Sequence, residues 1–262
     1  MTAEEKTTVA RFLDIAVDSL RDNYRSGERT YQFSDDIPPG VGPAAEAPLV
    51  AEESPTTAAP VTAAPAEDSL GQIAAEVRSC TACPLCETRN NAVPGEGVER
   101  PLVMTIGEGP GADEDAAGRP FVGRAGQLLD KMLRSIGLSR DTNCFIANVV
   151  KCRPPENRDP LPEERAACMP FLKRQIRILR PKFILCAGRI AAQTLLETGA
   201  PIGKLRGQFA ELRAAGMAVP LLATYHPSAL LRNEDLKRPA WEDLKMLRAA
   251  ITEDAAGAGG ES

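Results

Sequence analysis

Residues 102–123 read LVMTIGEGPGADEDAAGRPFVG, an apolar run followed at once by a glycine-rich loop. A short apolar run bounded by turn residues is typical of a strand buried on both faces of a sheet. Three more such runs follow: CFIANVV at 144–150, FILCAG at 183–188 and VPLLATY at 219–225. Helix-like segments separate them. The rhythm predicts an α/β domain, namely a three-layer α/β/α sandwich around a central, mainly parallel, four-stranded sheet.

The loops that follow these runs are the expected location of a functional site, because open parallel sheets bind ligands at the carboxyl ends of their strands. They are the loop at 107–123, the stretch around NVVKCRPP at 148–155 and the segment HPSALLRN at 226–233.

The chain divides into four segments by composition. Residues 1–35 are expected to form a helical extension, since apolar residues recur at helical spacing within 4–22. Residues 36–68 are rich in proline and alanine and predict a disordered linker. Residues 69–252 hold the α/β domain, and residues 253–262 form an acidic, flexible tail.

The net charge of −5 over 262 residues is unevenly distributed. Residues 1–70 carry 5 basic and 13 acidic side chains, whereas residues 71–250 carry 26 basic and 20 acidic ones. A basic body suits a polyanion such as DNA, although a mixed solvated surface would give the same balance. The apolar runs are too short to span a bilayer, and no secretory signal is evident at the start. We therefore expect a cytoplasmic protein.

The chain has seven cysteines, and their grouping suggests a metal centre. Grouped thiols in a reducing compartment more often bind metal than form disulfides. Cys144 and Cys186 fall within apolar strand runs and are expected to be ordinary buried side chains. Cys80 and Cys83 form a Cys-x-x-Cys pair. Two later thiols, Cys152 and Cys168, are separated by fifteen residues. Four thiolates from two loops suit either structural zinc or an iron–sulfur cluster, and the spacing leaves both open.

Two further features lie beside the expected ligand edge. The loop Gly107–Gly111 lacks the Gly-Lys-Ser/Thr ending of a phosphate-binding loop and the glycine spacing of a dinucleotide site. His226 is the only histidine and follows directly after a strand run. It is either a structural residue or a catalytic one.

Together these motifs resemble the family 4 uracil-DNA glycosylases, the iron–sulfur branch of the uracil-DNA glycosylase superfamily. The stretches that carry the resemblance are CTAC at 80–83, PGEG at 94–97, the loop and helix start at 107–133, NVVKCRPPENRDPLPEE at 148–164 with Cys168, and HPSALLR at 226–232. They cover residues 78–250 in order and leave the first 70 residues outside.

The resemblance implies a monofunctional glycosylase that starts base excision repair. Such an enzyme hydrolyses the N-glycosidic bond of uracil in DNA and leaves an abasic site. It also implies a [4Fe–4S] cluster with a structural role, held by Cys80, Cys83, Cys152 and Cys168. Cys86 has no counterpart in the family pattern and is expected to be a bystander.

The same resemblance assigns the base pocket. Phe121 is expected to stack on the flipped uracil, and Asn148 to read its edge. Backbone groups of Gly107, Glu108 and Gly109 complete the pocket. His226 is expected to stabilise the departing uracil anion with a hydrogen bond.

The carboxylate that orients the attacking water is a separate question. Family 1 enzymes have an aspartate where this chain has Gly109, so the activating group must differ. Glu108 and Asp113 are the two candidates; we expect Glu108 to bind through its backbone and Asp113 to help hold the water.

Contacts with the DNA backbone are expected from the segment after His226. Leu230 is predicted to be the apolar wedge that fills the gap left by the flipped nucleotide. Arg232 is predicted to contact a phosphate, and Lys151, Arg153 and Arg158 could add further phosphate contacts.

An alternative hypothesis is that the protein has this fold but no glycosylase activity and is a DNA-binding or polymerase-associated module. In either case the expected partner is DNA, with a replication or repair protein possible through the N-terminal helix. We expect a monomer in the bacterial cytoplasm or nucleoid, with no membrane association.

Overall fold

The computed structural model describes residues 30–32, 68–214 and 216–258. The predicted helix within 4–22 and nearly all of the proline- and alanine-rich segment lie outside the described residues. Among the helices that are described, none combines the length and apolar character needed to cross a membrane.

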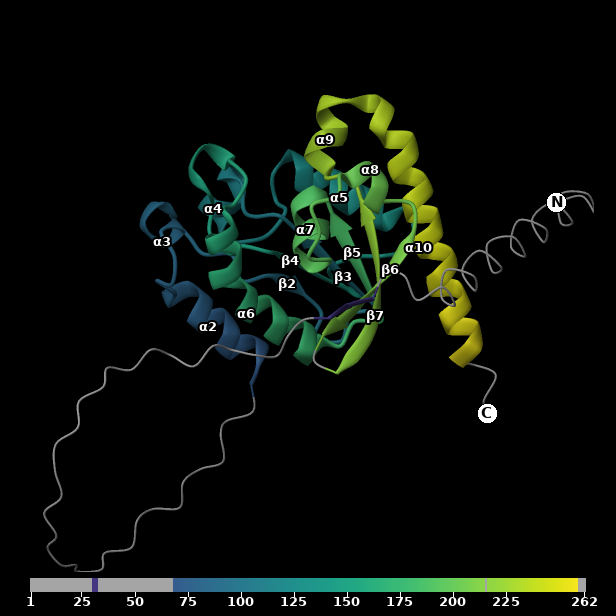
Figure 1. Ribbon diagram of the computed structural model, residues 1–262, viewed down its shortest axis with the longest axis horizontal. Coiled ribbons are helices and arrows are strands. Elements are labelled where there is room, and N and C mark those ends of the chain that lie inside the picture. The colour runs from purple at the N-terminus through teal and green to yellow at the C-terminus, as the bar shows by residue number, and fades with distance from the viewer. Residues whose placement is uncertain (1–29, 33–67, 215, 259–262) are drawn as a thin grey trace, which may run out of the picture.

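A seven-stranded sheet forms the centre of the molecule, in the order β1-β6-β7-β5-β3-β4-β2. Its middle consists of the four strands that the apolar runs predict, all mutually parallel (Figure 1). They are β3 (Val103–Gly107), β4 (Cys144–Asn148), β5 (Phe183–Ala187) and β7 (Met217–Thr224). The parallel core of the sandwich is therefore confirmed.

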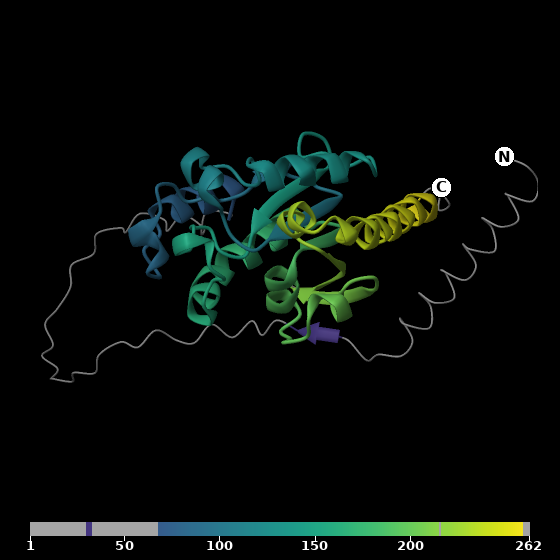
Figure 2. The ribbon, with the colours of Figure 1, turned by 90° about the horizontal axis from the view of Figure 1, so that it is seen from above.

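The expectation of only four strands is wrong, because three further strands extend the sheet. β6 (Phe209–Ala214) and β2 (Glu96–Gly97) pair antiparallel with β7 and β4. β1 (Thr30–Gln32) lies at the margin next to β6, where Figure 2 shows it in purple, within a segment predicted to be helical. None of the three carries a continuous apolar run, which is the signal that identified the others.

Helices cover both faces of the sheet. One face packs against α2 (Leu70–Ser79), α6 (Pro162–Leu179), α7 (Arg189–Leu195) and α8 (Ile202–Leu205). The other packs against α5 (Arg124–Arg134) and α10 (Lys237–Ala258). Alternate strand residues enter the two cores, as the pleat requires: Met104 and Ile106 enter the first and Val103 the second.

The remaining short elements are α3 (Leu85–Thr88), α4 (Ala112–Ala117), α9 (Pro227–Arg232) and the 3₁₀ turns η1 (Pro155–Asn157) and η2 (Glu234–Leu236). α4, α9 and η1 all follow strand ends of the parallel core. α10 is longer than expected: it continues past residue 252 to Ala258, so the start of the predicted flexible tail is helical.

Candidate functional site

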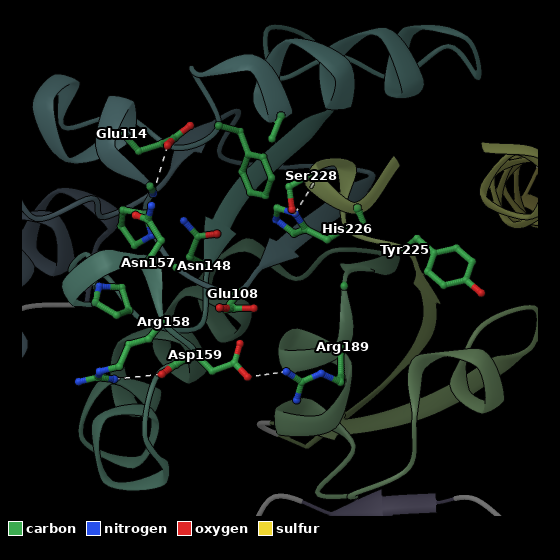
Figure 3. A pocket seen from close by; sticks show the side chains of 18 of the residues that line it. Glu108, Glu114, Asn148, Asn157, Arg158, Asp159, Arg189, Tyr225, His226 and Ser228 are labelled. Atoms are coloured by element: carbon green, nitrogen blue, oxygen red, sulfur yellow. Dashed lines mark hydrogen bonds and ion pairs between the residues drawn. The ribbon is translucent and has the colours of Figure 1, made fainter. Parts of the chain in front are cut away.

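A pocket of about 520 Å³ opens at the carboxyl ends of the parallel strands. Each strand of the parallel core contributes to its lining (Figure 3): Glu108 follows β3, Asn148 ends β4, Gly188 follows β5 and His226 follows β7. Phe121, from the segment between α4 and α5, lines it as well. The fold therefore gathers at one sheet edge the residues that the sequence placed in separate loops.

Phe121, Asn148 and His226 share this pocket. The rings of Phe121 and His226 lie with centroids 5.6 Å apart and planes tilted by 34°. Gly107 and Asn148 are register partners on β3 and β4. A Cβ atom on Gly107 would stand 2.5 Å from both the Phe121 ring and Asn148 Oδ1. The glycine therefore leaves the floor of the pocket open.

The backbone of Phe121 has a φ of 52°, which is unusual for a residue with a side chain. Two contacts hold it there. Arg140 donates to the carbonyl oxygens of Pro120 and Phe121, each at 2.9 Å, while its guanidinium pairs with Asp130. Gly126 lies so close that a Cβ atom on it would overlap the Phe121 carbonyl group. The ring is therefore pre-positioned before any ligand binds.

Asn148 is 1% exposed, and its Oδ1 atom has no hydrogen-bond partner within the described residues. Its backbone carbonyl accepts a 2.9 Å bond from Lys151 Nζ, which also donates to Gln175. A buried acceptor without a donor is costly unless a ligand supplies one. Lys151 itself is buried and faces inward, so the predicted phosphate contact from this residue is wrong.

His226 is held in one tautomer. Its Nδ1 atom accepts from the Ser228 backbone amide at 3.1 Å and lies 2.8 Å from Ser228 Oγ. Burial, reinforced by the charge of Arg232, lowers the pKa of His226 to about 4. The imidazole is consequently neutral near pH 7, and its proton is on Nε2. Gly188, with a φ of 104°, has no side chain that would collide with the imidazole.

Three carboxylates line the pocket, those of Glu108, Glu114 and Asp159. Burial, together with the negative charge of Asp159, raises the pKa of Glu108 to about 7, against the opposing charge of Arg189. Asp159 pairs with Arg189 at 2.5 Å across the pocket mouth (Figure 3). The pKa of Glu108 thus lies in the range where a carboxyl group can exchange a proton at physiological pH.

Asp113 does not line the pocket. It is exposed on α4 and lies against Gly123. The next residue, Glu114, does line it, but its carboxylate accepts from the amides of Gly111, Val122 and Gly123 at 2.9–3.1 Å. Glu114 fastens the glycine loop to the Phe121 segment. The expectation that Asp113 holds the water is not supported, because α4 directs it away from the cavity.

Leu230 is 2% exposed, so the prediction that it is the surface wedge is wrong. Neighbouring residues on a helix point about 100° apart, and α9 turns Leu230 inward and leaves Leu231 42% exposed. Arg232, on the same helix, is exposed and lines the pocket, as a phosphate contact requires.

A second, much smaller cavity of about 10 Å³ lies among the thiols of Cys80, Cys83, Cys86, Cys152 and Cys168. Arg89 Nη1 donates to Cys152 Sγ at 3.0 Å, and the Lys151 amide donates to Cys168 Sγ at 3.3 Å. Burial raises the pKa of Cys168 to about 11, so a thiolate there needs a compensating cation.

The donor set is five thiols around one cavity, and cysteine thiolates are the ligands of iron–sulfur clusters. In the described part of the chain, no three His, Cys, Asp or Glu side chains are arranged to hold one metal ion. The thiols instead surround a cavity, and in an iron–sulfur cluster each iron takes its own cysteine. Cys144 and Cys186 are fully buried in the strands, as expected, and lie outside this cavity.

Asp115 ties the loop after the first three cysteines to α4. This carboxylate is fully buried on α4 and accepts from the amides of Asn90 and Asn91 at 2.9 and 3.2 Å. It also accepts from Asn90 Nδ2 at 2.6 Å. The loop that follows the first three cysteines is therefore tied to the helix that carries Glu114.

Several lining residues were not singled out from the sequence, among them Arg189, Gly188 and Glu114. The first two directly follow the FILCA strand, so the rule that places ligands at strand ends would have indicated them. Glu114 is one of several acids in its loop, and nothing in the sequence separates it from Asp113.

Comparison with known proteins agrees with this geometry. Residues 94–245 match the model of the uracil DNA glycosylase superfamily. The chain therefore belongs to the uracil-DNA glycosylase superfamily.

Within that superfamily it groups with the type-4 enzymes. It is 48% identical over 174 residues to the type-4 uracil-DNA glycosylase of Pyrobaculum aerophilum, covering 65% of this chain and 88% of that protein. It is 44% identical over 184 residues to the Archaeoglobus fulgidus protein of that name (69% and 92%) and 42% over 191 residues to that of Thermotoga maritima (72% and 97%).

Proposed function

We propose that this protein is a uracil-DNA glycosylase that removes uracil from DNA by hydrolysis and leaves an abasic site. The observation that carries the proposal is the unpaired Oδ1 of buried Asn148, in one pocket with the Phe121 and His226 rings. The names of the type-4 relatives point to the same activity.

Recognition follows from the chemistry of these side chains. The target nucleotide has to leave the stack at a cost of a few kcal/mol, and stacking on Phe121 offsets roughly 1–3 kcal/mol of it. Asn148 Oδ1 accepts from uracil N3–H, and the amide nitrogen donates to O4. Cytosine presents the reverse pattern and leaves both groups unpaired, which is how the pocket rejects it.

Bond cleavage leaves negative charge on the uracil ring. A neutral His226 whose Nε2–H faces the pocket can donate to uracil O2, and that bond strengthens as the charge develops. The proposed carboxylate that orients water and stabilises positive charge on the sugar is Glu108, because it lines the pocket and Asp113 does not. None of the described residues that line the pocket is a lysine, and the proposed nucleophile is water, without strand cleavage.

On the DNA side, Leu231 rather than Leu230 is the proposed wedge. It is exposed on α9, beside Arg232 at the pocket rim. An apolar side chain there can occupy the gap in the base stack while Arg232 pairs with a neighbouring phosphate.

A [4Fe–4S] cluster on Cys80, Cys83, Cys152 and Cys168 is the proposed resident cofactor. When bound, it cross-links the helix α2 end, the segment after β4 and helix α6. Asp115 and Lys151 then connect these segments to the base pocket. The contribution is structural, and the reaction itself uses the side chains of the pocket.

We further propose that residues 69–252 form the catalytic domain, that residues 1–35 contact a replication or repair protein, and that the enzyme works as a monomer alongside cytoplasmic or nucleoid DNA.

The test of the activity is uracil release. The full-length protein is incubated with an oligonucleotide that contains one uracil, and with matched cytosine and thymine strands. Alkali then converts abasic sites to breaks. We expect breaks at uracil alone, and only after alkali. A protein that binds the oligonucleotides but yields no break above background would instead be the non-catalytic DNA-binding module.

A further inference from the structure

The N-terminal half of α10 exposes a stripe of basic and aromatic side chains. Arg238, Trp241, Lys245 and Arg248 are all exposed, with Trp241 at 40%. Their spacing of three, four and three residues puts them on one side of the helix. The stripe is about 15 Å long at 1.5 Å per residue. No residue of the base pocket belongs to it.

The stripe begins next to the pocket. Arg232 lines the pocket at the end of α9, η2 follows at once, and α10 starts at Lys237. Figure 1 shows α10 starting beside α9, at the carboxyl end of the strands, and running along the side of the molecule. Arg238 and Trp241 therefore lie in the first turns of α10, a short distance along the chain from the pocket-lining Arg232.

We propose that this stripe binds the single-stranded DNA that flanks the target nucleotide; this inference rests on the proposed function. One base stacks on Trp241, and Arg238, Lys245 and Arg248 contact the phosphates. Exposed aromatic rings interleaved with basic residues suit single strands, since every unpaired base offers a face for stacking. A duplex hides those faces, so it cannot use Trp241 in this way.

Acidic neighbours do not cancel the stripe. Glu242 pairs with Lys245 at 2.6 Å, and Glu234 pairs with Lys237 at 2.5 Å. Both pairs are between exposed groups three residues apart, and such pairs contribute little. Phosphates can therefore replace the carboxylates as partners for Lys245.

Tryptophan fluorescence reports on Trp241 alone, because it is the only tryptophan in the chain. A single-stranded oligonucleotide without uracil is titrated into the full-length, cluster-loaded protein while tryptophan fluorescence is followed. We expect quenching that saturates together with the anisotropy of a labelled oligonucleotide. A blunt duplex of the same sequence should quench far less.

Variants separate stacking from charge. By anisotropy, Trp241→Ala should weaken single-strand binding roughly 5- to 150-fold, whereas Trp241→Phe should retain most of it. Charge reversal at Arg238, Lys245 and Arg248 should lower the slope of log affinity against log salt by about 2. Lys131→Glu, an exposed reversal on α5, is the matched control and should change affinity less than twofold.

The outcome is distinguishable from failure of the glycosylase assignment, because the titration uses DNA without uracil. Binding without quenching, equal quenching by duplex, or wild-type affinity of Trp241→Ala would each overturn the proposal. As a second readout, Trp241→Ala should reduce kcat/KM on a long uracil strand but not on a strand too short to reach α10.

Discussion

Phe121 and His226 show how single residues are prepared for a ligand before it arrives. Phe121 is held at a φ of 52° by Arg140 and by the space that Gly126 leaves. His226 is held neutral by burial and by the Ser228 amide. Since the pKa of His226 is lowered to about 4, the unfolded chain binds a proton below pH 6.5 that the folded chain does not. The free energy of unfolding should therefore decrease as pH falls from about 6.5 to 4 because of this residue.

Replacing His226 tests its part in the reaction. His226→Ala should lower kcat for uracil release by roughly 10²- to 10³-fold, because one hydrogen bond to the developing anion is lost. KM should change much less. Single-turnover assays at pH 7 measure this, with thermal unfolding to verify that the variant folds. A variant within threefold of wild-type kcat would remove His226 from the mechanism.

Glu108 predicts a pH effect of the opposite sign. Its pKa is raised to about 7, so the folded state holds a proton between pH 4.5 and 7 that the unfolded chain has lost. Wild-type stability should fall over that window as pH rises. Glu108→Gln removes the penalty and should stabilise the protein by on the order of 2 kcal/mol at pH 8, with little effect at pH 4.5. Denaturant unfolding at the two pH values checks this, and equal effects at both would contradict it.

At the scale of elements, α4 is the connection between the thiol cavity and the base pocket. Glu114 fastens the glycine loop and the Phe121 segment, while Asp115 fastens the loop at Asn90 and Asn91. The two neighbouring carboxylates have different partners because the helix turns between them: Glu114 lines the base pocket, whereas Asp115 is buried against Asn90 and Asn91.

Asp115→Ala should break this connection. We expect a loss of about 2–3 kcal/mol in unfolding free energy, since buried amides lose a charged acceptor. We also expect weaker uracil-DNA binding, although Asp115 does not line the base pocket. Equilibrium unfolding and oligonucleotide binding are the measurements, with Glu253→Gln on α10 as the control. Unchanged DNA affinity despite the lost stability would show that α4 does not transmit the effect.

The individual elements also show what could and could not be predicted from the sequence. Four strands could be predicted because each is a continuous apolar run, and the site loops followed from the strand ends. β6 could not, because FAELRA mixes polar and apolar residues in a partly exposed strand. Leu230 and Asp113 were misassigned because a motif does not give the rotation of a short helix. That rotation is set by packing against the body, and it exposes Leu231 and directs Glu114 toward the pocket.

At the scale of the whole molecule, the cysteines that line the thiol cavity come from segments that are far apart in sequence. Cys152→Ser should therefore lose iron and lower the melting temperature, and it should reduce uracil release through loss of order around the pocket. Cys86→Ser is the matched control, because Cys86 lines the same cavity but is not among the proposed ligands. Metal analysis and thermal unfolding of both variants decide the ligand set. If Cys86→Ser loses iron while Cys83→Ser retains it, the two cysteines have to be exchanged.

The pocket of Phe121, Asn148 and His226 is tested most directly by the base it accepts. Uracil and cytosine release from matched oligonucleotides is measured for the wild type and for Asn148→Asp. The wild type should release uracil and leave cytosine, and the variant should lose uracil release by roughly 10²-fold or more, because a carboxylate cannot donate to O4. A variant that folds, binds DNA and still releases uracil at the wild-type rate would show that Asn148 does not read the base.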